Sequence, residues 1–184
     1  MKNSLILLGL FFVTTVGCPE ENSSKPDGVE YFEFLSSVYN TDDEEKILEL
    51  IREFENLYEN DKTILSYNIN LAQLYYHAGD GESAIEALEA EPTILKWYYL
   101  GTLQMRLGRI GEGRKNLEKY HSELIRNSEF NNKPVDPRVL FMIRKLLGYA
   151  AQISSEERDS YESDPQMMII NEASVDEILS GLWP

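Results

Sequence analysis

The stretches LAQLYYHAGDGESAI, residues 71–85, and WYYLGTLQMRLGRIGEGRKNL, residues 97–117, decide the fold of this chain. Each holds a leucine followed by a small residue, Ala72 or Gly101, and seven residues later a glycine, Gly79 or Gly108. The small residue lets one helix cross another closely, and the glycine permits a tight turn at the end of a helix. The two stretches therefore predict two consecutive helix–turn–helix pairs.

Apolar residues at three- and four-residue steps predict helices along most of the remaining chain. Thr41 to Glu44 has the pattern of a capping box, and Asp136 before Pro137 indicates another helix start. The expected helices are Val29–Tyr39, Asp42–Tyr58, Thr63–Ala78, Glu82–Ala90, Pro92–Leu107, Gly111–Arg126, Pro137–Ile153, Ser155–Ser163 and Ser174–Gly181. The apolar run Met167–Ile170 is expected to pack on these helices as a tail segment, with an edge strand as the alternative. The predicted fold class is all-α.

The paired stretches resemble two copies of a tetratricopeptide repeat (TPR). The residues that carry the resemblance are Leu71-Ala72-x-x-Tyr75-x-x-x-Gly79-Asp80-x-x-x-Ala84-Ile85 and Trp97-x-x-Leu100-Gly101-x-x-x-x-x-x-Gly108-x-x-x-x-Gly113-x-x-x-Leu117. The resemblance implies antiparallel helix pairs stacked as a short TPR-like superhelix over residues 29–184, clearest at 64–120, with Trp97 filling the space between neighbouring repeats. Residues 41–61 and Leu147-Gly148 would then belong to degenerate repeats. A helical bundle without repeats is the alternative.

The resemblance also implies a binding groove, because TPR domains line their concave face with helix A residues that lie beside the packing face. The expected groove residues are Ile69, Gln73, Tyr76, His77, Tyr98, Thr102, Met105 and Arg106. Tyrosine, methionine and arginine are frequent in the parts of interfaces that carry most of the binding energy. Adjacent helical residues point about 100° apart, so Tyr75-Tyr76 and Tyr98-Tyr99 are each expected to bury one ring and offer the other to the groove.

The first seventeen residues have the features of an export signal. Lys2 supplies a positive charge, and Leu5 to Val13 form an apolar run that is too short to span a bilayer. Thr15-Val16-Gly17-Cys18 follows and resembles the lipobox of bacterial lipoproteins. That resemblance implies cleavage after Gly17 and attachment of diacylglycerol and an N-acyl chain such as palmitate to Cys18, the only cysteine. An ordinary secretory signal with an incidental cysteine is the alternative.

Residues 18–28 are expected to form a flexible tether, because Pro19 to Gly28 contains no apolar side chain that a core could bury. The lipoprotein resemblance implies a cell-envelope location. Pro19 is not the aspartate that retains such proteins in the inner membrane of enteric bacteria, so the outer membrane is favoured.

The composition argues against several classes of function. With 17 Lys and Arg against 32 Asp and Glu, the net charge of the 184-residue chain is −15, and such an acidic protein is not expected to bind nucleic acid. His77 and His121 lie in no metal-binding motif, and the carboxylates at helix starts are explained by capping and the helix dipole. We expect no metal, no cofactor and no enzymatic activity, with an envelope hydrolase as a remote alternative.

The sequence as a whole predicts a membrane-anchored envelope lipoprotein whose TPR-like domain binds a protein partner, as a scaffold or assembly factor. The acidic body favours a basic or amphipathic segment of the partner. The alternative is a periplasmic binding protein for a small apolar or peptide ligand, with residues 165–184 closing the repeats into a pocket.

Overall fold

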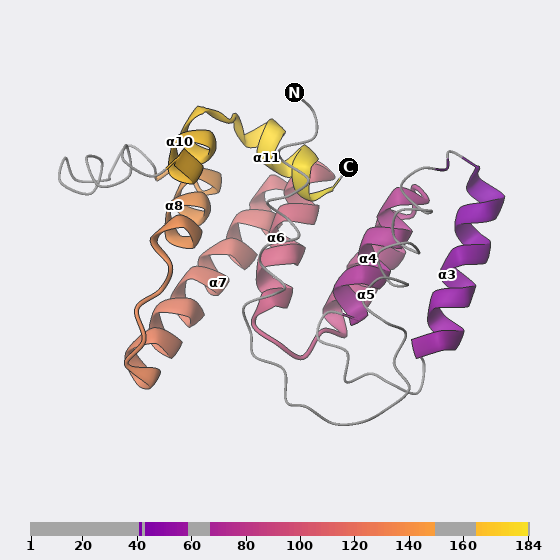
Figure 1. Ribbon diagram of the computed structural model, residues 1–184, viewed down its shortest axis with the longest axis horizontal. Coiled ribbons are helices and arrows are strands. Elements are labelled where there is room, and N and C mark those ends of the chain that lie inside the picture. The colour runs from indigo at the N-terminus through magenta and orange to yellow at the C-terminus, as the bar shows by residue number, and fades with distance from the viewer. Residues whose placement is uncertain (1–40, 42, 59–66, 150–164, 184) are drawn as a thin grey trace. The chain divides into compact units, whose positions relative to one another are not determined.

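The computed structural model describes residues 41, 43–58, 67–149 and 165–183, and all regular structure in that part of the chain is α-helical (Figure 1). The all-α prediction is confirmed for these residues. The chain divides after Glu91 into two compact units. The expected signal peptide, Cys18, the tether and the expected helices Val29–Tyr39 and Ser155–Ser163 lie outside the described residues.

The first unit contains α3 (Glu44–Tyr58), α4 (Tyr67–His77) and α5 (Gly81–Glu89). The capping box expected at Thr41 is wrong, because Asp43 caps α3. Its carboxylate accepts hydrogen bonds from the backbone N–H groups of Glu45 and Lys46 at 3.1 and 3.3 Å, whereas the Thr41 hydroxyl accepts from the N–H of Asp43, which precedes the helix. A carboxylate directly before the helix reaches the free amides of the first turn and also favours the positive end of the helix dipole.

The core of the first unit is built on α4, which packs against α3 and α5. Phe54 of α3 stacks on Tyr67 of α4 with 5.3 Å between ring centroids. Ala72 of α4 and Ala84 of α5 are completely buried, as expected for small residues where two helices cross. Asp80 caps α5, because its carboxylate accepts the N–H of Ser83 at 3.0 Å.

The second unit contains α6 (Leu95–Arg106), α7 (Ile110–Asn131), α8 (Pro137–Leu146), α10 (Pro165–Glu172) and α11 (Val175–Leu182). Helix α6 packs along α7 and also contacts α11, while α8 contacts α7 and α10. Gly101 and Gly113 face each other where α6 crosses α7. A Cβ on Gly113 would lie 2.6 Å from the carbonyl oxygen of Gly101, so the two backbones are in direct contact.

Three helices end in the same way, at Gly79, Gly108 and Gly148, with φ between 77° and 80°. After each glycine the next N–H bonds back to the carbonyl five residues earlier, as in Asp80 to Tyr75, and this satisfies carbonyls that the helix end leaves free. The ends at Gly79 and Gly108 confirm the predicted turns.

The third glycine corrects a prediction. Gly148 ends α8 at Leu146, so the expected helix Pro137–Ile153 is wrong at residues 147–149, and residues 150–153 lie outside the described residues. Leu147-Gly148 therefore corresponds to the turn dipeptide Leu107-Gly108, and not to Leu100-Gly101 on helix A. The predicted start is confirmed, because the carboxylate of Asp136 accepts the N–H of Arg138 at 2.9 Å.

Other boundaries also differ from the expectation. Helix α7 continues to Asn131, five residues past Arg126, and ends at Asn132 with φ 51°, a conformation that asparagine tolerates. Helix α6 begins at Leu95, three residues after Pro92. The run Met167–Ile170 lies within α10, so the edge-strand alternative is wrong; Ile170 is buried, while Met168 and Ile169 are exposed.

Candidate binding surfaces

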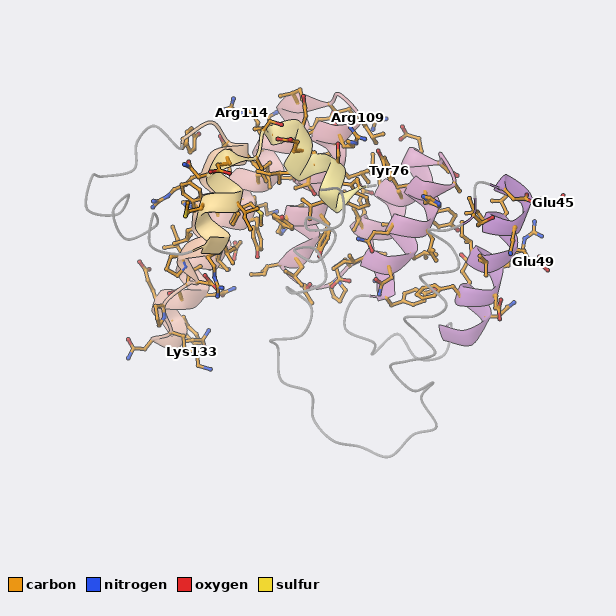
Figure 2. All side chains as sticks on the ribbon, turned by 45° about the horizontal axis from the view of Figure 1, so that its top comes forward. Glu45, Glu49, Tyr76, Arg109, Arg114 and Lys133 are labelled. Carbon is orange, nitrogen blue, oxygen red and sulfur yellow. The ribbon has the colours of Figure 1, made fainter. Side chains whose placement is uncertain are left out.

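The expected groove residues of α4 are mostly accessible. Gln73, Tyr76 and His77 are half-buried, and only Ile69 is fully in the core. Nε2 of His77 lies 3.4 Å from the carbonyl oxygen of Thr41, which lies three residues before the start of α3. Tyr76 lies near the C-terminal end of α4 (Figure 2). Gln73, Tyr76 and His77 therefore present one amide, one aromatic ring and one imidazole at the surface of α4, and we call these three residues the α4 face.

Tyr75, the neighbour of Tyr76, has a structural role. Its hydroxyl donates a hydrogen bond to Oε1 of Glu55 on α3 at 3.0 Å. Partial burial and this carboxylate raise the pKa of Tyr75 to about 12, because both favour the neutral phenol. The bond ties α4 to α3 and holds the phenol of Tyr75 against α3.

The expected groove residues of α6 lie differently. Tyr98, Thr102 and Met105 are buried, and only Arg106 is exposed. The hydroxyl of Tyr98 donates to the sulfur of Met142 on α8 at 3.7 Å, and burial raises the pKa of Tyr98 well above its ordinary value. Tyr99 is buried as well, so the expectation that one ring of this pair remains available is wrong.

Helix α11 explains the burial of Thr102. The indole N–H of Trp183, at the end of α11, donates to the Thr102 hydroxyl oxygen at 3.0 Å, and both side chains have no exposed surface. The Trp183 ring also meets Tyr99 edge to face at 6.2 Å. A partner could contact Thr102 only after α11 had moved away.

Helix α10, which precedes α11 in the chain, is fixed to α8. The ammonium group of Lys145 on α8 donates to the carbonyl oxygen of Ile170 at 2.7 Å and also to that of Asn171. Cations near the C-terminus of a helix satisfy its last carbonyls and complement its dipole. The C-terminal segment is therefore held on both α6 and α8.

Charge is distributed very unevenly between the units. The described residues of the first unit include eleven Asp and Glu but only two Lys and Arg, Lys46 and Arg52. Glu45 and Glu49 lie on the side of α3 that faces away from α4 (Figure 2), and both are exposed. Leu48, 45% exposed, lies beside these two carboxylates, and exposed Arg52 follows one helical turn later.

Residues 92–149 of the second unit have the opposite balance, with eleven Lys and Arg against five Asp and Glu. Four of these cations border the α6–α7 turn and are exposed: Arg106, Arg109, Arg114 and Lys115. Leu107 and Ile110 of the same turn are 37% and 48% exposed. The turn is thus a basic surface with two aliphatic side chains. Arg109 and Arg114 lie near one end of α7, and Lys133 near the other (Figure 2).

Sequence reasoning missed this basic turn because it used the net charge of the whole chain. A count by region would have found it, since the cations are concentrated within residues 92–149. Trp97 is also placed in a basic setting, with the ammonium group of Lys119 3.4 Å and that of Lys96 4.9 Å from its ring centroid. These are cation–π distances, and the two lysines hold the half-buried indole at the start of α6.

The described residues contain no group of three or more His, Cys, Asp or Glu side chains that could hold a metal ion. His121 of α7 has a buried Nε2 without a hydrogen-bond partner, and burial together with the charge of Arg144 lowers its pKa. In the described part of the chain, no helix is long and apolar enough to cross a membrane. Searches against protein-family models, curated proteins and solved structures found no match.

Proposed function

We propose that the protein is a lipid-anchored envelope lipoprotein whose TPR-like helix pairs bind a partner protein. The anchor is proposed from Thr15-Val16-Gly17-Cys18, with Cys18 carrying the acyl chains. Two or more chains make a stable anchor, whereas one is marginal. Residues 18–28 form the tether, and Pro19 favours the outer membrane.

The repeat proposal is supported by two helix pairs built on equivalent residues. Ala72 and Ala84 are the small buried residues of the first pair, and Gly101 and Gly113 are those of the second. The turn glycines Gly79 and Gly108 have nearly the same φ, 80° and 79°. Repeated helix pairs present extended faces that other proteins bind, and this repetition is the observation that carries the proposal.

The proposed partner site is the α4 face, with Gln73, Tyr76 and His77. The strongly acidic first unit favours a basic or amphipathic segment of the partner, because complementary charges speed association and exclude other partners. Tyr76 is the aromatic anchor of the site, since tyrosine combines a large apolar ring with a hydroxyl that forms hydrogen bonds.

The test is crosslinking of the full-length protein in native membranes, followed by affinity purification and mass spectrometry. Wild type is compared with Tyr76→Ala and with Phe130→Ala, a matched loss of an aromatic ring at a residue that is 88% exposed in the second unit. We expect one partner protein with wild type and Phe130→Ala that is lost with Tyr76→Ala. A partner retained by all three proteins would reject the α4 face.

The anchor has its own test. Cys18→Ser removes the only thiol that could be acylated, so the variant is expected in the soluble fraction while wild type sediments with membranes. If Cys18→Ser also sediments with membranes after a high-salt and carbonate wash, the lipid anchor at Cys18 is wrong.

The packing of α10 and α11 favours a second candidate function, a binding protein for a small apolar or peptide ligand. Trp183 at the end of α11 covers Thr102 and Tyr99 of α6, and such a cover can close over a ligand. Native mass spectrometry of protein purified from membranes tests this candidate, which predicts a bound molecule lost upon Trp183→Ala. Protein that carries no molecule in either form would reject it.

A further inference from the structure

We propose that copies of this chain associate head to tail, with the α3 face of one copy docked on the α6–α7 turn of the next. The α3 face is defined by Glu45, Leu48 and Glu49. The turn surface is defined by Ile110 with Arg109 and Arg114, and Leu107, Arg106 and Lys115 lie beside it. The proposal relies on the proposed lipid anchor to concentrate the copies at a membrane, but the contacts between the copies do not depend on the anchor.

The two surfaces match in pattern. On α3, the exposed side chain of Leu48 lies beside two carboxylates, Glu45 and Glu49, that are four residues apart, or about 6 Å along the helix. At the turn, exposed Ile110 directly follows Arg109, and Arg114 lies four residues further along α7, or about 6 Å along the helix. Each surface has the anatomy of a small interface, with an apolar centre and a charged rim, and the rims have opposite sign.

The net charge of −15 does not prevent this contact. At physiological ionic strength the Debye length is about 8 Å, so exposed charges outside the contact are largely screened. The charges near the contact itself attract each other. The α3 face belongs to a unit whose described residues include eleven acidic and two basic side chains, and four cations border the turn. Arginine is well suited to this surface because its planar group has five N–H donors, and Arg114 uses only Nη2 in its hydrogen bond to the carbonyl oxygen of Leu147 at 2.8 Å.

The proposed contact joins two different surfaces. The two surfaces belong to different units of the chain, so a contact between two copies leaves one unused surface of each kind. Such heterologous contacts build closed rings or open chains. Confinement to a membrane raises the effective concentration of each copy, so a contact that is weak in solution suffices there.

The test uses disulfide crosslinking of the full-length chain in native membranes. Two tagged forms, Leu48→Cys and Ile110→Cys, are expressed together and oxidised mildly. We expect a mixed disulfide dimer of the two forms. Lys133→Cys replaces Ile110→Cys as the control, because it lies at the other end of α7, and it is expected to give little crosslink with Leu48→Cys.

Charge variants test whether the opposite charges of the two surfaces cause the association of the copies. Glu45→Lys/Glu49→Lys alone, or Arg109→Glu/Arg114→Glu alone, is expected to lower the crosslinked fraction about tenfold, because each places like charges together. All four substitutions on one chain restore opposite signs at every contact and leave the net charge unchanged. They are therefore expected to restore the crosslink between copies.

Three results would overturn the proposal. The first is the absence of a mixed dimer, and the second is equal crosslinking of Leu48→Cys with Lys133→Cys and with Ile110→Cys. The third is a disulfide within single chains that carry both Leu48→Cys and Ile110→Cys. The last result would mean that the two surfaces meet inside one molecule. Crosslinking is scored in whichever fraction contains the protein, so a failed lipid anchor is seen as a change of fraction and not as a loss of the contact.

Discussion

Replacing Gly113 with alanine should test the close crossing of α6 and α7 most directly. A Cβ at this position would lie 2.5 Å from Cγ of Met105, 2.6 Å from the carbonyl oxygen of Gly101 and 3.0 Å from the backbone nitrogen of Met105. The methionine side chain can rotate away, but the two backbone atoms belong to α6 itself. The methyl group can therefore be accommodated only if the helices separate.

The expected size of the effect follows from two opposing terms. Alanine favours a helix over glycine by about 1 kcal/mol, whereas overpacking a tight core costs about 1–3 kcal/mol and more where backbone must move. Because the closest contacts of Gly113 include backbone, we expect the overpacking term to exceed the helix gain. Gly113→Ala should lower the free energy of unfolding by about 1–2 kcal/mol.

Gly111→Ala is the matched control, because it makes the same change in the same helix. Nothing lies within 4 Å of the position that its Cβ would take, so only the helix gain remains. We expect this variant to be as stable as wild type or more stable by up to about 1 kcal/mol. Urea unfolding followed by circular dichroism measures both variants. Equal stability of Gly113→Ala and Gly111→Ala would refute the close crossing.

Three further predictions concern other contacts. Trp183→Phe should lower the free energy of unfolding by about 2 kcal/mol in urea titrations, since it removes buried volume and the hydrogen bond to Thr102; an unchanged value would mean that α11 contributes little to stability. Gly148→Ala should lower the free energy of unfolding by about 1–2 kcal/mol through backbone strain alone, because φ is 77° and its Cβ would meet nothing within 4 Å. Gly148→Asn should lower it less in the same urea titrations. Burial raises the pKa of Tyr120 to about 12, so the folded state keeps its phenol neutral while the unfolded chain ionises near pH 10. The stability gained from Tyr120, up to about 2–3 kcal/mol, should be present below pH 10 and lost by pH 12, and Tyr120→Phe should flatten that decline in alkaline urea titrations.

The helix pairs could be predicted from the sequence because their determinants are local. Gly79, Gly108, Asp136 and Pro137 mark ends and starts within a few residues of the helices that they delimit. The end of α7 could not be predicted in this way, because residues 127–131 have no apolar period. That helix continues through polar residues until Asn132, where the left-handed conformation ends it.

The binding surface was harder to predict because its cover is distant in sequence. Thr102 and Trp183 are 81 residues apart, and nothing near Thr102 indicates that an indole will bond to its hydroxyl. The expected groove residues of α6 were selected by their positions on helix A of a repeat. These positions identify one face of the helix, but they do not reveal what packs on that face. On α4, the same reasoning led to three residues that are at least partly accessible, Gln73, Tyr76 and His77.

The two helix pairs differ where the helix packing does not constrain them. Glu86 of α5 and Lys115 of α7 each lie two residues after the small crossing residue, Ala84 or Gly113, and both are exposed. Since neither side chain takes part in the crossing, its charge is free to change without cost to the fold. The charges at this position are opposite, as are those of the acidic first unit and the basic turn in the second. This difference is therefore better explained by what each surface binds than by how each pair folds. The α4 face and the α6–α7 turn should accordingly bind partners of different chemistry, and a substitution at Lys115 should affect association while leaving the helix pair intact.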